Sequence, residues 1–212
     1  MFNSMLEKAI LKSQRCQRNF DLSRSIPEED IDTLKVAVTQ CSSKQNRVFY
    51  KAHFITNRDV IQQLYDLTDG FMINFETRET KKNPQVLANL VVAFSEDLSV
   101  DEGLRTTEEI DLGKVLTTEE AKVVGRTEQD VFTAVGIAAG YLTYTANLLG
   151  YSTGCCQCFS QVSVGKVLGE DKTFLLMGIG FPNKDKNRRI DQTDPDFVFP
   201  SHNKVIKVND IR

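Results

Sequence analysis

The sequence lacks the features that usually mark membrane, secreted and nucleic-acid-binding proteins. Its 212 residues contain no apolar run of about 18 residues, the length at which a helix spans a bilayer. Glu7 and Lys8 interrupt the apolar pattern at the N-terminus, so this end does not resemble a signal peptide. The formal net charge of -3 is too small to attract nucleic acid. We therefore expect a protein that binds neither membranes nor nucleic acids.

Cysteine and histidine are scarce, which limits the sites that they can form. The five cysteines are an odd number in a chain without an export signal, so we expect a reducing cytosol and no disulfide framework. Cys155 and Cys158 have C-x-x-C spacing, but a structural zinc needs two more ligands. There is no second such pair, and the only histidines are His53 and His202. Zinc is therefore disfavoured, whereas a thiol redox role for this turn stays open.

Familiar catalytic and nucleotide-binding motifs are also missing. Neither GxGxxG nor the P-loop motif occurs, which argues against a Rossmann enzyme or a P-loop NTPase. No convincing Ser/His/Asp or Cys/His arrangement stands out. The length suits one well-buried domain over residues 1–212, because single cores usually stop growing only beyond roughly 250 residues.

Hydrophobic periodicity predicts helices and strands that alternate without a strict βαβ rhythm. We expect helices near 27–39, 59–68, 129–149 and 160–168, and strands near 48–55, 90–94, 173–180 and 204–208. Ser25 and Glu28 have capping-box spacing, with Pro27 at the first helical position. This order of elements fits an α+β sandwich better than a doubly wound sheet.

The segment 129–149 is apolar on every side of a helix and rich in small residues. Such a helix must be covered on most sides. Gly136 and Gly140 each cost about 1 kcal/mol relative to alanine, so we expect a close helix–helix contact to compensate. We assign part of this surface to a subunit interface, and complete burial inside one chain is the alternative. Gly150 supplies the helix stop.

The segment 95–126 is the most charged and least periodic part of the chain. We interpret it as a surface excursion with one short helix, which begins at the capping box Thr117–Glu120. Two functions are open for this segment. It is either a lid over a binding site or a solvated loop.

Basic residues gather near both ends of the chain. Arg15 and Arg18 lie near the start, and Lys184, Lys186, Arg188 and Arg189 lie near the end. Each cluster alone is simply explained as a solvated face. Because the planar fork of arginine binds phosphate bidentately, a phosphate gripped from both ends is the functional alternative.

Five collinear segments resemble motifs of the FMN-dependent nitroreductase family. The segment QRCQRNF at 14–20 is similar to the family's RRSxRxF opening, and CSSKQN at 41–46 is similar to its PSSxN loop before a strand. The family's order continues through NPQVL at 83–87, the long Ala/Gly-rich helix, and GIGFP at 178–182 before the terminal arginines. The chain departs from the pattern at Gln14, Cys16 and Cys41, where arginine, serine and proline are usual.

The resemblance implies a three-layer sandwich, with a central, mostly antiparallel sheet flanked by helices, in an intertwined homodimer that binds FMN at the subunit boundary. Residues from both chain ends would surround the phosphate and the pyrimidine edge of FMN, namely Gln14, Arg15, Cys16, Arg18, Arg188 and Arg189. A loop of the neighbouring subunit would also reach the flavin, through Ser42, Ser43 and Asn46, with Gln45 as a competitor for the last position. Asn83 and Gln85 belong to the implied site, and a backbone N–H of Gln157 or Cys158 would meet flavin N5.

The resemblance also implies a function. Such an enzyme transfers hydride from NAD(P)H through FMN to a small-molecule acceptor, a nitroaromatic, quinone or similar compound, in a ping-pong cycle. The flavin would carry the chemistry, which accounts for the missing acid, base and nucleophile, and Arg18 is the candidate to stabilise negative charge on it. Two alternatives stay open: a flavin-binding or redox-sensing module with little turnover, and a thiol or metal protein without flavin.

Overall fold

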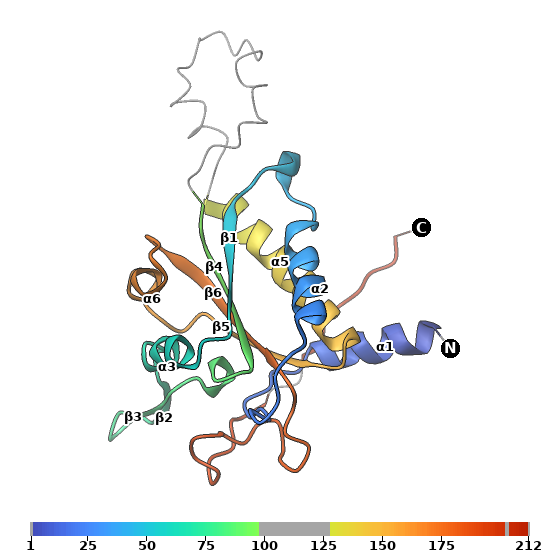
Figure 1. The fold of residues 1–212 in the computed structure, drawn as a ribbon. Coiled ribbons are helices and arrows are strands. Elements are labelled where there is room, and N and C mark those ends of the chain that lie inside the picture. Colours follow the sequence, from blue (N-terminus) through green and yellow to red (C-terminus); the bar gives the residue numbers. More distant parts are fainter. Residues whose placement is uncertain (1, 98–127, 202–203, 212) are drawn as a thin grey trace.

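A computed structural model describes residues 2–97, 128–201 and 204–211 of the chain. Its centre is a four-stranded antiparallel sheet in the order β1-β4-β6-β5 (Figure 1). The strands are β1 (Tyr50–Ile55), β4 (Leu90–Glu96), β5 (Ser152–Cys156) and β6 (Thr173–Gly180). The central strands β4 and β6 are buried along almost their whole length, which explains why both are nearly continuous apolar runs in the sequence.

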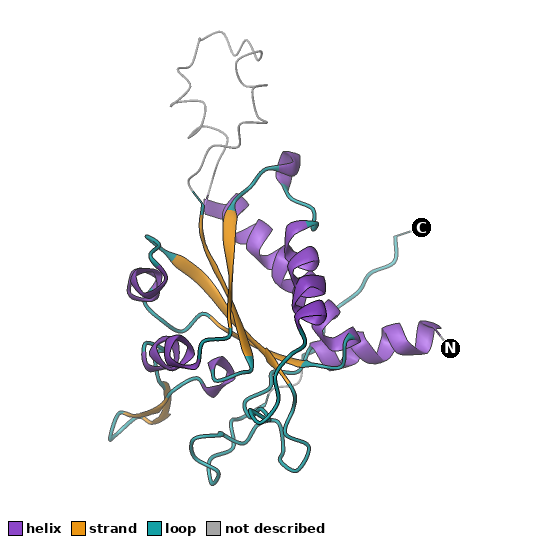
Figure 2. Cartoon of the chain, viewed as in Figure 1, coloured by secondary structure: helices purple, strands orange, loops and turns teal. Residues whose placement is uncertain are grey.

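Helices cover both faces of this sheet and complete a three-layer sandwich (Figure 2). On one face lie α2 (Glu28–Thr39) and α5 (Glu128–Leu148), and on the other lie α3 (Arg58–Asp66) and α6 (Gln161–Leu168). Successive strand side chains point to opposite faces, so Met177 packs into the core beneath α2 and α5, whereas Leu176 packs into the core beneath α3 and α6. None of the described helices has the length and hydropathy needed to cross a bilayer.

The predicted fold class and most predicted elements are confirmed. The helices expected at 27–39, 59–68, 129–149 and 160–168 are present, as are the strands at 48–55, 90–94 and 173–180, with small shifts at their ends. Gly150 ends α5 as predicted, with a φ of 96°. The N–H groups of Gly150 and Tyr151 donate to the carbonyls of Asn147 and Ala146 at 3.2 and 2.9 Å, which closes a Schellman motif.

Two predictions are wrong. Pro27 is the capping residue of α2 rather than its first helical residue, and no side chain caps this helix within the described structure. Residues 204–208 form no strand, because they pair with no strand among the described residues, and Val205 is 87% exposed. The capping box predicted at 117–120, the rest of the predicted excursion beyond residue 97, and His202 lie outside the described residues.

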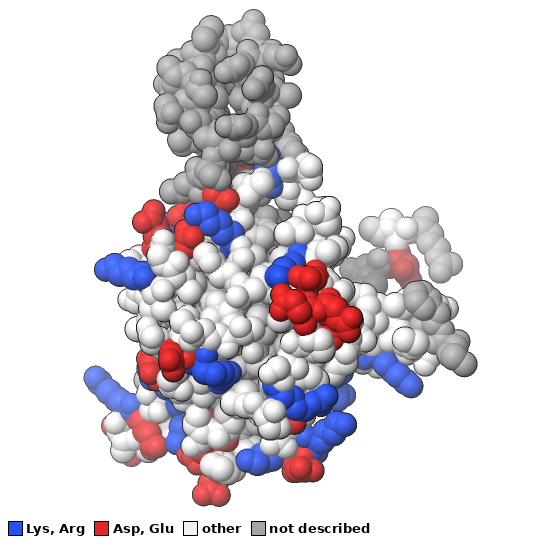
Figure 3. Space-filling view, viewed as in Figure 1, with Lys and Arg blue, Asp and Glu red and all other residues white. Residues whose placement is uncertain are grey.

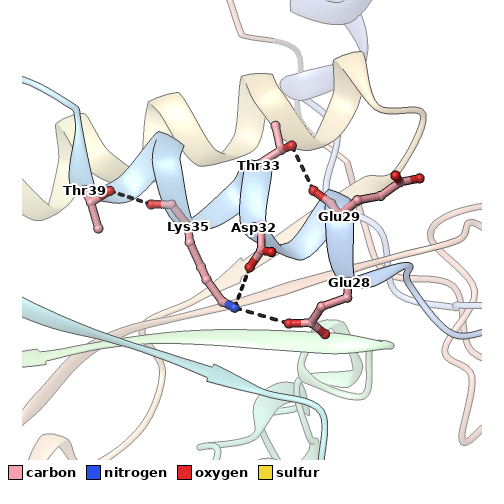
Figure 4. Close-up of polar contacts among 6 residues, drawn as sticks. All are labelled: Glu28, Glu29, Asp32, Thr33, Lys35 and Thr39. Carbon is pink, nitrogen blue, oxygen red and sulfur yellow. Dashed lines mark hydrogen bonds and ion pairs between the residues drawn. The ribbon is translucent and has the colours of Figure 1, made fainter.

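The polar side of α2 faces outward. Lys35 Nζ lies 2.8 Å from Asp32 Oδ1 and 3.3 Å from Glu28 Oε1 (Figure 4). Acidic side chains in the first turn suit the positive end of the helix dipole, and they form a visible acidic patch (Figure 3). Exposed ion pairs contribute little stability, so burial of Ile31, Leu34 and Val38 on the opposite side holds the helix in place.

Only one side of α5 is buried within the chain. Val131, Ala138 and Leu142 pack into the core, whereas Phe132 is 37% and Tyr141 is 50% exposed. A Cβ built on Gly136 or on Gly140 would meet no described atom within 4 Å. The described residues therefore do not bury this helix completely, and they provide no contact that requires either glycine.

One helix and three strands do not appear among the predictions. They are α1 (Phe2–Ser13), the hairpin formed by β2 (Phe71–Asn74) and β3 (Glu79–Lys81), and β5. Helix α1 extends outward from the layers (Figure 1). Ala9 of this helix is buried. Lys12 Nζ anchors α1 by donating to the carbonyls of Gly150 and Tyr151 at 3.0 and 2.7 Å.

Candidate cofactor site

The segment after α1 joins the edge of the sheet to the C-terminal loop. Cys16 is bridged to Thr153 of β5, and the Gln17 N–H donates to the Thr153 carbonyl at 2.8 Å. The side-chain amide of Asn19 donates to the carbonyls of Asn187 and Ile190 at 2.7 and 2.9 Å. The two basic ends of the chain are therefore adjacent at one side of the sheet (Figure 1).

Four arginines meet here. Arg188 Nη1 donates to the Cys16 carbonyl at 3.1 Å, and the Arg18 N–H donates to the Arg188 carbonyl at 3.0 Å. Burial lowers the pKa of Arg188, and the charges of Arg15, Arg18 and Arg189 lower it further. None of the four pairs with a carboxylate in the described structure. A phosphate matches the chemistry of this concentration of positive charge.

Phe199 contacts two of these arginines. The Arg18 guanidinium carbon lies 4.6 Å from the Phe199 ring centroid, and Arg189 Nη1 donates to the Phe199 carbonyl at 3.2 Å. Arg18 Nε is buried and has no hydrogen-bond partner among the described atoms. A buried donor without a partner costs about 1–3 kcal/mol, so a bound acceptor at this place would recover that free energy.

Gln85 and Gly154 pack closely against each other next to Cys16. Gln85 Nε2 donates to the Cys155 carbonyl and to Asn83 Oδ1, both at 3.3 Å, while Gln85 Oε1 is buried without a partner in the described residues. A Cβ on Gly154 would lie 2.5 Å from Gln85 Cβ and 3.2 Å from Cys16 Sγ. Only glycine fits here.

The turn after β5 lies next to Asn83. Asn83 Nδ2 donates to the Asp69 carbonyl at 2.5 Å, and the Asp69 N–H donates to the Cys158 carbonyl at 2.6 Å. Gln157 and Cys158 are exposed. The predicted residues Cys16, Arg18, Asn83, Gln85, Cys158 and Arg188 are thus linked through a short series of contacts.

Two thiols of this region, those of Cys16 and Cys156, do not favour the thiolate form. Burial raises the pKa of Cys156 to about 12. Burial also raises the pKa of Cys16, although Arg18 and Arg188 oppose it. Metal ligation and nucleophilic attack both need the thiolate. No group of three or more His, Cys, Asp or Glu side chains placed to hold a metal occurs in the described ranges.

Other predicted residues lie apart from this cluster. Ser42, Ser43 and Asn46 follow α2 at its far end from the arginines (Figure 1). Ser43 Oγ donates to the Arg47 carbonyl at 2.7 Å, and Asn46 has a φ of 55°. The exposed Gln14 donates to the Leu11 carbonyl at 3.1 Å instead of facing the arginines. One chain therefore does not assemble the whole predicted set.

Solved structures share this arrangement of elements. A nitroreductase-like protein from Streptococcus mutans is 16% identical with a TM-score of 0.65, and the match covers 95% of this chain and 100% of that one. A protein classed as a nitroreductase from Exiguobacterium sibiricum, in complex with FMN, is 17% identical with a TM-score of 0.62, over 92% and 91% of the two chains. The chain has the nitroreductase fold.

A third structure has the same fold. It is a protein from Staphylococcus epidermidis classed as an NAD(P)H:FMN oxidoreductase, 18% identical with a TM-score of 0.59, over 88% of this chain and 89% of that one. No protein-family model and no curated protein matches the sequence. The similarity therefore resides in the nitroreductase fold rather than in residue identity.

Three features of the site were not found by sequence reasoning. Phe199 lies in a loop without a motif, and its contact with Arg18 joins residues far apart in the chain. Asn19 lies inside the QRCQRNF segment, but its role in joining both chain ends depends on the carbonyls of the C-terminal loop. The close packing of Gly154 against Gln85 was also missed. A glycine between larger residues in the cysteine-rich stretch was the signal that could have indicated it.

Proposed function

We propose that the protein is an FMN-dependent oxidoreductase of nitroreductase type that works as a homodimer. NAD(P)H is the electron donor in this proposal, and the acceptor is a nitroaromatic, a quinone or a similar small molecule. The observation that carries the proposal is the cluster of four arginines, which has no carboxylate partner among the described residues. The nitroreductase fold supports it, because one protein with this fold is a complex with FMN.

The residues present fit FMN. Arg15, Arg18, Arg188 and Arg189 supply the positive charge that a ribityl phosphate and a pyrimidine edge require. The buried Arg18 Nε is a donor and the buried Gln85 Oε1 is an acceptor, and both lack partners in the described structure. A flavin offers both kinds of group.

Bound FMN would supply hydride transfer, and the chain would supply binding, orientation and charge. Arg18 would stabilise negative charge on the flavin ring. The turn at Gln157 and Cys158 would present a backbone N–H to the ring, and Asn83 would hold this turn through Asp69. No side chain needs to act as a nucleophile in this scheme.

A second subunit would complete the site. The exposed side of α5 bears Phe132, Tyr141 and Leu148, and the outer part of α1 bears Met5 and Ile10. Residues 204–211 are an exposed extended segment with several apolar side chains, Val205, Ile206, Val208 and Ile211. Large exposed apolar surfaces mark interaction sites. In this proposal Ser42, Ser43 and Asn46 reach the flavin of the partner.

Spectroscopy and turnover test the proposal together. We expect the purified protein to be yellow, or to become so with added FMN, and to oxidise NADH or NADPH when a quinone or nitroaromatic is present. A protein that binds FMN without turnover would instead be a flavin-binding or sensing module. A protein that does not bind FMN would refute both.

A further inference from the structure

Phe199 is buried at the place where the C-terminal loop meets the arginine cluster. Its side chain is 3% exposed. The Phe199 N–H donates to the Arg189 carbonyl at 3.0 Å, and Arg189 Nη1 donates back to the Phe199 carbonyl at 3.2 Å. The backbone of Phe199 is therefore attached to one arginine while its ring lies against another, Arg18.

Two more aromatic rings fix the orientation of the Phe199 ring. Phe197 lies against it edge-on, with ring centroids 4.9 Å apart, and Phe71 of β2 lies 5.8 Å away at a tilt. An ion pair between Lys81 of β3 and Asp194 ties the same loop to the hairpin. The face presented to Arg18 is thus held by contacts from several elements.

Arg18 depends on this ring for its orientation. Its guanidinium has no carboxylate partner in the described part of the chain, and its buried Nε has no acceptor there. Fixing an arginine side chain in one conformation costs rotamer entropy, which a contact must offset. The aromatic face favours one plane of the guanidinium through cation–π attraction.

We propose that Phe199 is a positioning residue, which holds the Arg18 guanidinium in the plane in which it contacts the flavin. This inference rests on the proposed FMN site. Phe199 itself touches the cofactor nowhere in this scheme and acts through Arg18. The effect is on cofactor affinity and on the reduction potential of the bound flavin, because a well-placed cation stabilises negative charge on the ring.

The experiment compares Phe199→Leu, Phe199→Tyr and the control Phe197→Leu in FMN titrations followed by flavin fluorescence. Phe197 packs on the same ring, and the structure shows no stacking of it on Arg18. We expect Phe199→Leu to weaken FMN binding about fivefold and to shift the flavin potential to a more negative value. Phe199→Tyr keeps an aromatic face and should retain both properties, and Phe197→Leu, which removes one support of the Phe199 ring but leaves the ring itself against Arg18, should have a clearly smaller effect than Phe199→Leu.

A double-mutant cycle with Arg18→Ala separates positioning from packing. Phe199→Leu should have no further effect on FMN affinity once Arg18 is absent. The inference is overturned if Phe199→Leu weakens binding equally in both backgrounds, or if it matches Phe197→Leu in affinity and potential. If the wild type binds no FMN, the proposed function is refuted, and this inference is refuted as well because it rests on the FMN site. Circular dichroism of each variant identifies a loss of folding. If Phe199→Leu does not fold, the test is the same double-mutant cycle with Phe199→Tyr, and a folded Phe199→Tyr variant that weakens FMN binding about fivefold or more would overturn the inference.

Discussion

Gly140→Arg should separate the two subunits while leaving the single chain folded. No described atom lies within 4 Å of a Cβ built at this exposed position, so a side chain can leave the helix here without a clash at its first atom. Arginine is also a better helix former than glycine, which stabilises α5 in a monomer by about 0.8 kcal/mol. Within one chain, the substitution is therefore neutral or stabilising.

In the proposed dimer the same substitution is destabilising. A charge moved into an apolar interface costs several kcal/mol, and two-fold symmetry places one copy from each subunit there. If each copy costs about 3 kcal/mol, the dissociation constant of the dimer rises roughly 10⁴-fold. Because Ser42, Ser43 and Asn46 would then be withdrawn from the partner's site, FMN should be released as the dimer dissociates.

Sedimentation velocity with simultaneous detection of flavin absorption measures both effects. Gly140→Ala is the matched control, because it adds helix propensity without bulk or charge and should keep the dimer and the flavin. An unchanged dimer in Gly140→Arg would refute the placement of α5 in the interface. A monomer that still holds FMN would refute the linkage between assembly and cofactor binding.

Four further results are expected. Arg18→Ala, or Arg188→Ala with Arg189→Ala, should weaken FMN binding by about 1.5–3 kcal/mol per lost charged hydrogen bond in fluorescence titrations, and undiminished affinity in both would remove the phosphate assignment. Gly154→Ala should lower the free energy of unfolding by about 1–3 kcal/mol in urea, because its Cβ would meet Gln85 Cβ at 2.5 Å and the Gln17 carbonyl at 2.7 Å. Serine at Cys155, Cys156 and Cys158 together should keep flavin and at least part of the reductase activity, whereas stoichiometric zinc in the wild type would favour a metal protein. Burial, opposed by Glu170 and aided by Lys51, lowers the pKa of His53 below its ordinary 6.5. The unfolded chain then binds this proton more readily, so stability should fall as pH drops through 6.5, and His53→Gln should reduce this slope in urea unfolding.

Local patterns predicted the elements whose burial is evident in the sequence. The run at 173–180 is buried at every position, so its apolar residues alone indicated β6. The residues of β5, Ser-Thr-Gly-Cys-Cys, have no such pattern, and their strand exists because β6 pairs with them on one side and Cys16 covers them on the other. Residues 204–208 show the converse, since residues suited to a strand form none without a partner.

The candidate site was predictable only where a local pattern marks its residues. Arginine clusters at both chain ends suggested a shared anion, and Asn19 and Arg188 do bring these ends together. The position of Phe199 over Arg18 follows from the path of the C-terminal loop, which no local pattern specifies. The distance of Ser42 and Asn46 from the arginines in one chain could be anticipated only from the family resemblance.

The central claim is that this chain binds FMN and passes electrons through it. Anaerobic titration of the FMN-loaded protein with NADH and with NADPH tests this directly. We predict that at least one donor bleaches the flavin absorption, and that a quinone or nitroaromatic then restores it. A protein that takes up no FMN, or whose bound flavin neither nicotinamide bleaches, would contradict the claim.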